Sequence, residues 1–274
     1  MIRIGEITYA NCIPIFAGLR KKDPRGPYSY HAGEPATLNG LLFSGKIDLA
    51  PASSLEYGLH PDRYFLVPDL SISSGHEVQS VILLSRIPVE NLDGKTVLLS
   101  PASASSNALV RILLEKRYGM DCRYAYADGE GSTIPRECDA RVAIGDGALK
   151  TYLNRSGALH LYDLSVLWRE FTGLPFVFAL WLVSREAAER EPENVRRLVL
   201  QLHEARDYAQ SHFAELAGEF EQRLEISALA LVRYWESISF DLSSEKIDSL
   251  HKFYGYAEEL GFIPESPPLN FFLG

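Results

Sequence analysis

Short apolar runs alternate with amphipathic segments along the first third of the chain. Five runs have the length and apolar content of buried strands: residues 2–7, 28–31, 46–51, 65–67 and 78–84. Between them, residues 34–45 predict a helix, because Pro35 suits its first turn and Gly45 suits its end. Strands separated by helices indicate parallel pairing within an α/β layer.

A second α/β unit follows in the middle of the chain. Its predicted elements are strands at 95–100, 124–126 and 140–144 and a helix at 107–117. The next apolar run, residues 176–184, is long enough and apolar enough for a strand that is buried on both faces. Helical spacing dominates the C-terminal third, so the chain as a whole has the pattern of an α/β protein.

Two apolar runs, residues 80–86 and 176–184, flank the middle unit. The simplest arrangement makes both of them crossings between two lobes. Lobe one then comprises residues 1–85 and 185–274, and lobe two comprises residues 86–184 with the crossing strands. A ligand is expected between the lobes, at the carboxyl ends of the strands.

Hydroxyl groups are concentrated at residues 100–106, between a predicted strand and a predicted helix. This segment contains Ser100, Ser103, Ser105 and Ser106. The first N–H groups of a helix have no partner within it, and the helix dipole makes that end partly positive. One serine there is explained by N-capping alone. Four serines in this position favour a site that binds an anion, such as a carboxylate.

The overall charge limits the partners of this protein. Its 274 residues carry a net charge of −9, from 27 Lys and Arg against 36 Asp and Glu. We expect no nucleic-acid partner, since there is no basic run. An anionic ligand needs local donors, such as helix N-termini and hydroxyl groups, because the overall field repels it.

Other features exclude several classes of protein and site. No apolar stretch approaches the ~20 residues of a membrane span, and the charges at Arg3 and Glu6 do not fit a signal peptide. We therefore expect a cytoplasmic protein without a membrane partner. The cysteines, Cys12, Cys122 and Cys138, have no metal-binding spacing. With no phosphate-binding or dinucleotide motif either, we expect no metal and no cofactor.

Several short motifs between positions 5 and 179 carry a family resemblance. They are Gly5-x-Ile-x-Tyr9-x-Asn11-x-x-Pro14, Ser53-Ser54-x-Glu56-Tyr57, Val78-x-Ser80, Ser103-x-Ser105-Ser106, Ile144-Gly145-Asp146 and Thr172-Gly-Leu-Pro-Phe-Val-Phe-Ala179. Together they resemble the chorismate dehydratase family of the futalosine route to menaquinone. The resemblance implies a type 2 periplasmic-binding-protein-like fold, with two α/β lobes and a cleft between them. It also implies a hydro-lyase that converts chorismate to 3-[(1-carboxyvinyl)oxy]benzoate.

Two alternatives remain at this point. The dihydroxynaphthoate synthase of the same pathway is similar in fold, but we expect a catalytic His in that enzyme near the position of Gly145 and Asp146, where this chain has none. A non-catalytic solute-binding protein for a small anion is the other alternative, and we expect an export signal in such a protein. The sequence leaves the oligomeric state open.

The resemblance assigns catalytic roles to Asn11 and Ser80. Taken alone, Asn11 fits a turn, and Ser80 needs a hydrogen-bond partner within an apolar strand. Substrate contacts are expected from seven further residues: Ser53, Ser54, Ser103, Ser105, Ser106, Asp146 and Phe178. The general base is either a carboxylate of the substrate, which we favour, or Asp146 or His76. Cys12 has no expected role.

Overall fold

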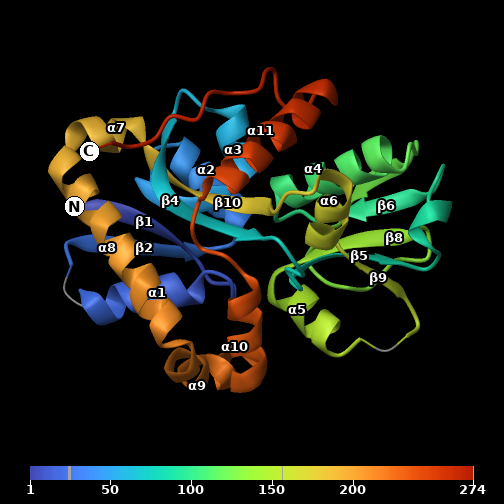
Figure 1. The fold of residues 1–274 in the computed structure, drawn as a ribbon, viewed down its shortest axis with the longest axis horizontal. Coiled ribbons are helices and arrows are strands. Elements are labelled where there is room, and N and C mark those ends of the chain that lie inside the picture. The colour runs from blue at the N-terminus through green and yellow to red at the C-terminus, as the bar shows by residue number, and fades with distance from the viewer. Residues whose placement is uncertain (24–25, 156, 274) are drawn as a thin grey trace.

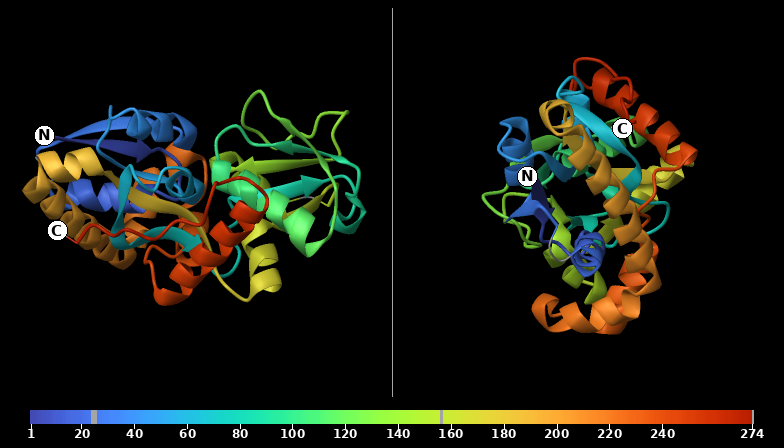
Figure 2. Two further views of the ribbon diagram at one scale, coloured as in Figure 1. Left: turned by 90° about the horizontal axis from the view of Figure 1, so that it is seen from above. Right: turned by 90° about the vertical axis from the view of Figure 1, so that its left-hand side faces the viewer.

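The computed structural model of the protein has two α/β lobes that lie side by side (Figure 1, Figure 2). It describes residues 1–23, 26–155 and 157–273. The four remaining residues, which fall within the predicted lobe ranges, lie outside the described part. Each lobe is built on a five-stranded sheet, and the N- and C-termini lie in the same lobe (Figure 1).

The sheet of lobe one has the strand order β2-β1-β3-β10-β4. These strands are β1 (Ile2–Ile7), β2 (Tyr28–Gly33), β3 (Leu49–Ser53), β4 (Tyr64–Ser74) and β10 (Phe176–Ser184). β1 pairs in parallel with β2 and β3, as expected. The expected parallel pairing is wrong for β4, which pairs antiparallel with β10, and β10 is also antiparallel to β3. β4 leads the chain toward lobe two and β10 brings it back, so the two strands must run in opposite directions.

The sheet of lobe two has the strand order β7-β6-β8-β5-β9. Its strands are β5 (Val81–Ser85), β6 (Thr96–Leu99), β7 (Arg123–Tyr126), β8 (Ala140–Ile144) and β9 (His160–Asp163). β6 is parallel to β7 and β8, whereas β5 is antiparallel to β8 and β9. β5 is therefore antiparallel to both of its neighbours in lobe two, as β10 is in lobe one.

The chain passes between the lobes in two short connections, residues 75–80 and 173–175. β5 pairs only with strands of lobe two, and β10 pairs only with strands of lobe one. The prediction that residues 80–86 and 176–184 themselves cross between the lobes is therefore wrong. All of β10 is buried within lobe one. Its apolar pattern fits a central strand of either sheet equally well, so the pattern did not show which sheet it joins.

Helices cover both sheets. Lobe one carries α1 (Ile13–Lys22), α2 (Pro35–Phe43), α3 (Ser54–Leu59), α7 (Arg185–Arg190), α8 (Pro192–Ser211), α9 (Phe213–Leu224), α10 (Ala228–Ser237) and α11 (Ser244–Glu259). Lobe two carries α4 (Ala104–Ile112), α5 (Gly145–Leu153) and α6 (Leu164–Thr172). A 3₁₀ turn (Val89–Asn91) and a π-helical turn (Leu113–Arg117) complete lobe two. Within the described ranges, no helix is both long and apolar enough to cross a membrane.

Candidate active site

Five helices begin around one cavity between the lobes. α1, α2 and α3 belong to lobe one, and α4 and α5 belong to lobe two. The cavity is lined by one residue at or next to the start of each helix: Asn11, Pro35, Ser53, Ser103 and Gly145. The partly positive ends of five helix dipoles therefore lie around the same space. This arrangement favours an anionic ligand.

The cavity itself is small and has an apolar wall. Its volume is about 50 Å³, which is enough for a few water molecules but far below the ~300 Å³ of small ligand pockets. Side chains of Ile7, Ile72, Val81, Ile144 and Phe178 form the apolar part of the wall. Phe178 thus lies where the sequence predicted it. A ligand of more than a few atoms does not fit in a space of this volume.

Asn11 lies in the tight turn between β1 and α1. The turn is closed by a hydrogen bond of 3.0 Å from the Cys12 N–H to the Tyr9 carbonyl. The Asn11 side chain lines the cavity, and its Oδ1 atom is buried without a hydrogen-bond partner. A buried polar atom without a partner is costly, so its presence calls for an explanation. Among the described residues nothing donates to this oxygen, which is therefore free to accept a hydrogen bond from a donor of a ligand, such as a hydroxyl group.

Ser80 lies at the end of the first connection and also lines the cavity. Its hydroxyl accepts a hydrogen bond of 2.8 Å from the Tyr234 hydroxyl. It donates to the Val78 carbonyl at 3.2 Å, which is long for a bond between a hydroxyl and an oxygen. Sequence reasoning missed Tyr234, because a tyrosine at helical spacing looks like any other core residue.

Three serines join the lobes next to the cavity. The Ser105 hydroxyl, from α4, lies 2.5 Å from the Ser53 hydroxyl and 2.9 Å from that of Ser54. It also accepts a hydrogen bond of 2.9 Å from the Leu55 N–H, and so caps α3 from the opposite lobe. Ser54 donates in addition to the Val177 carbonyl at 2.8 Å. Ser53 lines the cavity, whereas Ser54 and Ser105 lie behind its wall.

Ser103 and Ser106 occupy the start of α4 and both line the cavity. The Ser103 hydroxyl accepts a hydrogen bond of 3.3 Å from the Ser106 N–H, and the two hydroxyl groups are 2.9 Å apart. Ser103 is therefore an N-cap, which is the ordinary role of serine here. The same two side chains still present hydroxyl groups to the cavity.

Asp146 connects the lobes and does not line the cavity. Its carboxylate accepts a hydrogen bond of 2.8 Å from the Ala10 N–H of lobe one. Burial raises the pKa of the Asp146 carboxyl, while the Ala10 N–H acts in the opposite direction. His76 is exposed on the first connection and is also absent from the cavity lining. Neither side chain is placed where the sequence-based hypothesis of a protein base needs it.

Tyr9 also lines the cavity, although the sequence pattern predicts no role for it in the site. Its ring packs against Gly145 of lobe two, where an added Cβ atom would lie 3.0 Å from the ring. Gly145 has a φ of +68°, a conformation that favours glycine. Burial, and after it the carboxylates of Glu130, Glu34 and Asp146, raise the pKa of the Tyr9 hydroxyl. Tyr9 is therefore a neutral hydrogen-bond donor at the cavity.

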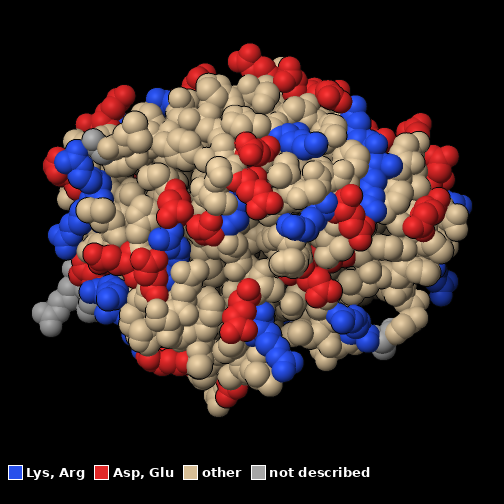
Figure 3. All heavy atoms as spheres, viewed as in Figure 1, with Lys and Arg blue, Asp and Glu red and all other residues tan. Residues whose placement is uncertain are grey.

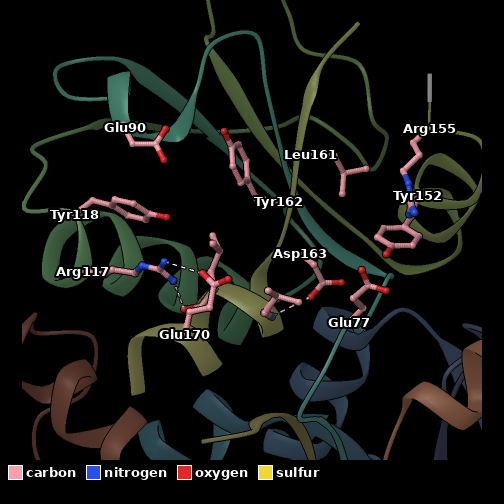
Figure 4. A pocket seen from close by; sticks show the side chains of 12 residues that line it. Glu77, Glu90, Arg117, Tyr118, Tyr152, Arg155, Leu161, Tyr162, Asp163 and Glu170 are labelled. Carbon is pink, nitrogen blue, oxygen red and sulfur yellow. Dashed lines mark hydrogen bonds and ion pairs between the residues drawn. The ribbon is translucent and has the colours of Figure 1, made fainter. Parts of the chain in front are cut away.

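A larger cavity, of about 420 Å³, lies beside β9 on lobe two (Figure 4). An ion pair of 2.7 Å between Arg117 and Glu170 forms part of its lining. No predicted site residue lines it. Asp163 also lines this cavity. Its carboxylate accepts hydrogen bonds from the Gln79 N–H at 2.7 Å and the Ser165 N–H at 3.0 Å. Asp163 thereby ties the first connection to the start of α6.

Asp163 gives the protein a predictable dependence on pH. Burial raises its pKa to about 6, whereas an aspartate in the unfolded chain has a pKa of ~3.9. The folded state therefore retains a proton that the unfolded state loses, and the free energy of unfolding falls by about 3 kcal/mol as the pH rises through this window. We expect Asp163→Asn to remove this loss, so that its melting temperature relative to the unchanged protein rises between about pH 4 and pH 6. Calorimetric scans that stay parallel across that range would contradict the prediction.

Comparison with known proteins decides the family. The family model for menaquinone biosynthesis matches residues 2–259. A chorismate dehydratase of Thermus thermophilus is 34% identical over 278 residues, which cover 96% of this chain and 96% of that protein. The chain belongs to the chorismate dehydratase family. The family resemblance predicted from the short motifs is thus confirmed.

More distant relatives place the family among similar folds. The 1,4-dihydroxy-6-naphtoate synthase of Thermus thermophilus is 25% identical over 84% of both chains. The periplasmic aliphatic sulphonate binding protein SsuA of Escherichia coli has a TM-score of 0.69 at 16% identity, covering 98% of this chain and 90% of SsuA. This likeness confirms the predicted periplasmic-binding-protein-like fold for this chorismate dehydratase family member.

Proposed function

We propose that this protein eliminates water from chorismate to give 3-[(1-carboxyvinyl)oxy]benzoate, in the futalosine route and in the cytoplasm. The observation that carries the proposal is the meeting of five helix N-termini in one cavity that the Asn11 side chain and the hydroxyl groups of Ser53, Ser80, Ser103 and Ser106 also line. Chorismate has two carboxylates, which these donors suit. Membership of the chorismate dehydratase family supports the same substrate.

Local donors are needed because the net charge of the protein opposes the approach of an anion. The net charge is −9, and acidic and basic side chains are interspersed over the face shown in Figure 3. N–H and hydroxyl donors bind a carboxylate without adding charge, and they act most strongly where water is excluded. Closure of the two lobes around the substrate supplies that exclusion.

The reaction draws its driving force from the substrate. Loss of the C3 hydrogen and the C4 hydroxyl makes the ring aromatic, and the two groups leave together as one water molecule. The enzyme must then orient chorismate and provide a proton acceptor near C3. We propose that the enolpyruvyl carboxylate of chorismate is this acceptor, held in place by Asn11 and Ser80. The positions of Asp146 and His76 outside the cavity lining support this substrate-assisted mechanism.

Incubation of the purified protein with chorismate tests the proposed function. We expect conversion to 3-[(1-carboxyvinyl)oxy]benzoate without added metal or nucleotide, followed by ultraviolet absorbance and mass spectrometry. Binding of chorismate without any conversion would favour the solute-binding alternative instead.

Two substitutions test the identity of the base. In Asp146→Asn the amide oxygen still accepts the Ala10 hydrogen bond, so we expect kcat to stay within about fivefold of the unchanged enzyme. His76→Ala should leave kcat unchanged, because His76 is exposed on the connection. Loss of a protein base typically lowers kcat by ~10²–10⁴-fold. A loss of that size in either folded variant, measured at saturating chorismate, would overturn the substrate-assisted mechanism.

A further inference from the structure

Two consecutive residues of α10 form hydrogen bonds with the two segments that carry the candidate catalytic residues Ser80 and Asn11. Tyr234 is 1% exposed and donates a hydrogen bond of 2.8 Å to the Ser80 hydroxyl. Trp235 is fully buried, and its Nε1–H donates at 2.8 Å to the carbonyl of Ala10, the residue before Asn11. Neither side chain lines the cavity. α10 therefore supports both sides of the cleft from behind.

The hydrogen bond from Tyr234 fixes the direction of the Ser80 hydroxyl. Burial raises the pKa of Tyr234, so its hydroxyl stays protonated and remains a donor. A serine hydroxyl has one hydrogen and two lone pairs. Because one lone pair accepts from Tyr234, the hydrogen of Ser80 must point away from Tyr234, toward other acceptors.

Only a weak acceptor holds that hydrogen in the described structure. The Val78 carbonyl lies 3.2 Å from the Ser80 hydroxyl and already accepts the Ser80 N–H at 2.6 Å. A carboxylate in the cavity is a stronger acceptor, since charged hydrogen bonds are shorter and about twice as strong as neutral ones. Donation from Tyr234 also polarises Ser80 and strengthens the bond that Ser80 makes in turn.

We propose that Tyr234 is a positioning residue that directs the hydrogen of Ser80 into the cavity, toward the substrate carboxylate. This role rests on the proposed function of Ser80. Without Tyr234, the Ser80 hydroxyl can rotate and spend part of its time donating elsewhere. The carboxylate that acts as base is then held less often in its reactive position, so the effect falls on kcat more than on KM.

A double-mutant cycle tests this proposal. Tyr234→Phe removes one hydroxyl and keeps the buried ring, and we expect it to lower kcat about tenfold with KM changed less than twofold. In the Ser80→Ala background the same substitution should change kcat less than twofold, because there is no hydroxyl left to direct. Tyr64→Phe is the matched control: Tyr64 is 1% exposed and donates to Glu56 at 2.9 Å, away from the cavity. It should lose a similar amount of stability and keep both kcat and KM.

Two results would overturn the proposal. One is an equal loss of kcat from Tyr234→Phe in both backgrounds, which would mean that Tyr234 acts independently of Ser80. The other is unchanged kcat in Tyr234→Phe alone. If the unchanged protein binds chorismate without converting it, the proposed function fails, but the same cycle read as the Kd of chorismate still tests the coupling of Tyr234 to Ser80.

Discussion

Replacement of Asn11 by alanine is expected to lower kcat/KM for chorismate about 100-fold and to leave the melting temperature within about 2 °C. In the proposed mechanism the Asn11 Nδ2 group donates to a carboxylate of the substrate, and a hydrogen bond to a charged group contributes ~1.5–3 kcal/mol. The fold loses little, because the Asn11 Oδ1 atom has no hydrogen-bond partner within the described protein. Steady-state kinetics and a thermal melt of the same preparation check both parts.

Two further variants make the Asn11 experiment specific. Asn11→Asp keeps the shape of the side chain but places a negative charge next to a carboxylate of the substrate. We therefore expect a larger loss of kcat/KM, of about 1000-fold. Asn39→Ala is the control, since the Asn39 Oδ1 atom is also buried without a partner but lies on α2 away from the cavity lining. Its kcat/KM should be unchanged. Near-normal kcat/KM in Asn11→Ala would refute the assignment.

Ser105→Ala is expected to destabilise the protein by about 3–4 kcal/mol and to lower its melting temperature by about 6–10 °C. The substitution leaves the Leu55 N–H buried without an acceptor, and it removes hydroxyl contacts with Ser53 and Ser54. An unsatisfied buried donor costs ~1–3 kcal/mol, and each lost hydroxyl bond adds ~1 kcal/mol. Chemical denaturation with a two-state analysis measures the loss.

Ser184→Ala separates this effect from the ordinary loss of a helix cap. Ser184 is 8% exposed and caps α7 with one hydrogen bond of 3.2 Å to the Ala187 N–H, within a single lobe. A single N-cap contributes ~1 kcal/mol, so we expect this control to lose about 1 kcal/mol and to keep its kcat/KM. If the two serine variants lose the same stability, the contact between the lobes contributes no more to the free energy of unfolding than an ordinary helix cap does.

The sequence predicted the location of the cavity because strand ends and helix starts are local properties. Asn11 follows β1, Ser53 follows β3 and Ser103 follows β6, and each pattern was visible in a few residues. Parallel strands bring such positions to one edge of a sheet. The family resemblance added Ser80, whose local pattern alone indicated only a core serine.

Long-range contacts could not be predicted in the same way. Asp146 has the local pattern of a helix cap, but its partner is the Ala10 N–H, 136 positions earlier in the chain. The Tyr234 hydroxyl reaches Ser80 across 154 positions. The apolar pattern of β10 indicated that the strand is buried, but not which sheet it joins or in which direction it runs. These properties depend on how the lobes pack, and no short segment carries that information.

The serine contact between the lobes affects how strongly the substrate is held. Ser105 completes α3 and Asp146 accepts a hydrogen bond from the Ala10 N–H, so bonds within the protein itself stabilise the contact between the two lobes. Any motion of the lobes apart breaks these bonds, so a ligand that needs a wider cavity has its intrinsic affinity multiplied by the fraction of molecules in which the lobes are apart. Ser54 and Ser105, which join the lobes from behind the cavity wall, can therefore change the concentration at which a ligand binds without altering an atom of the cavity lining.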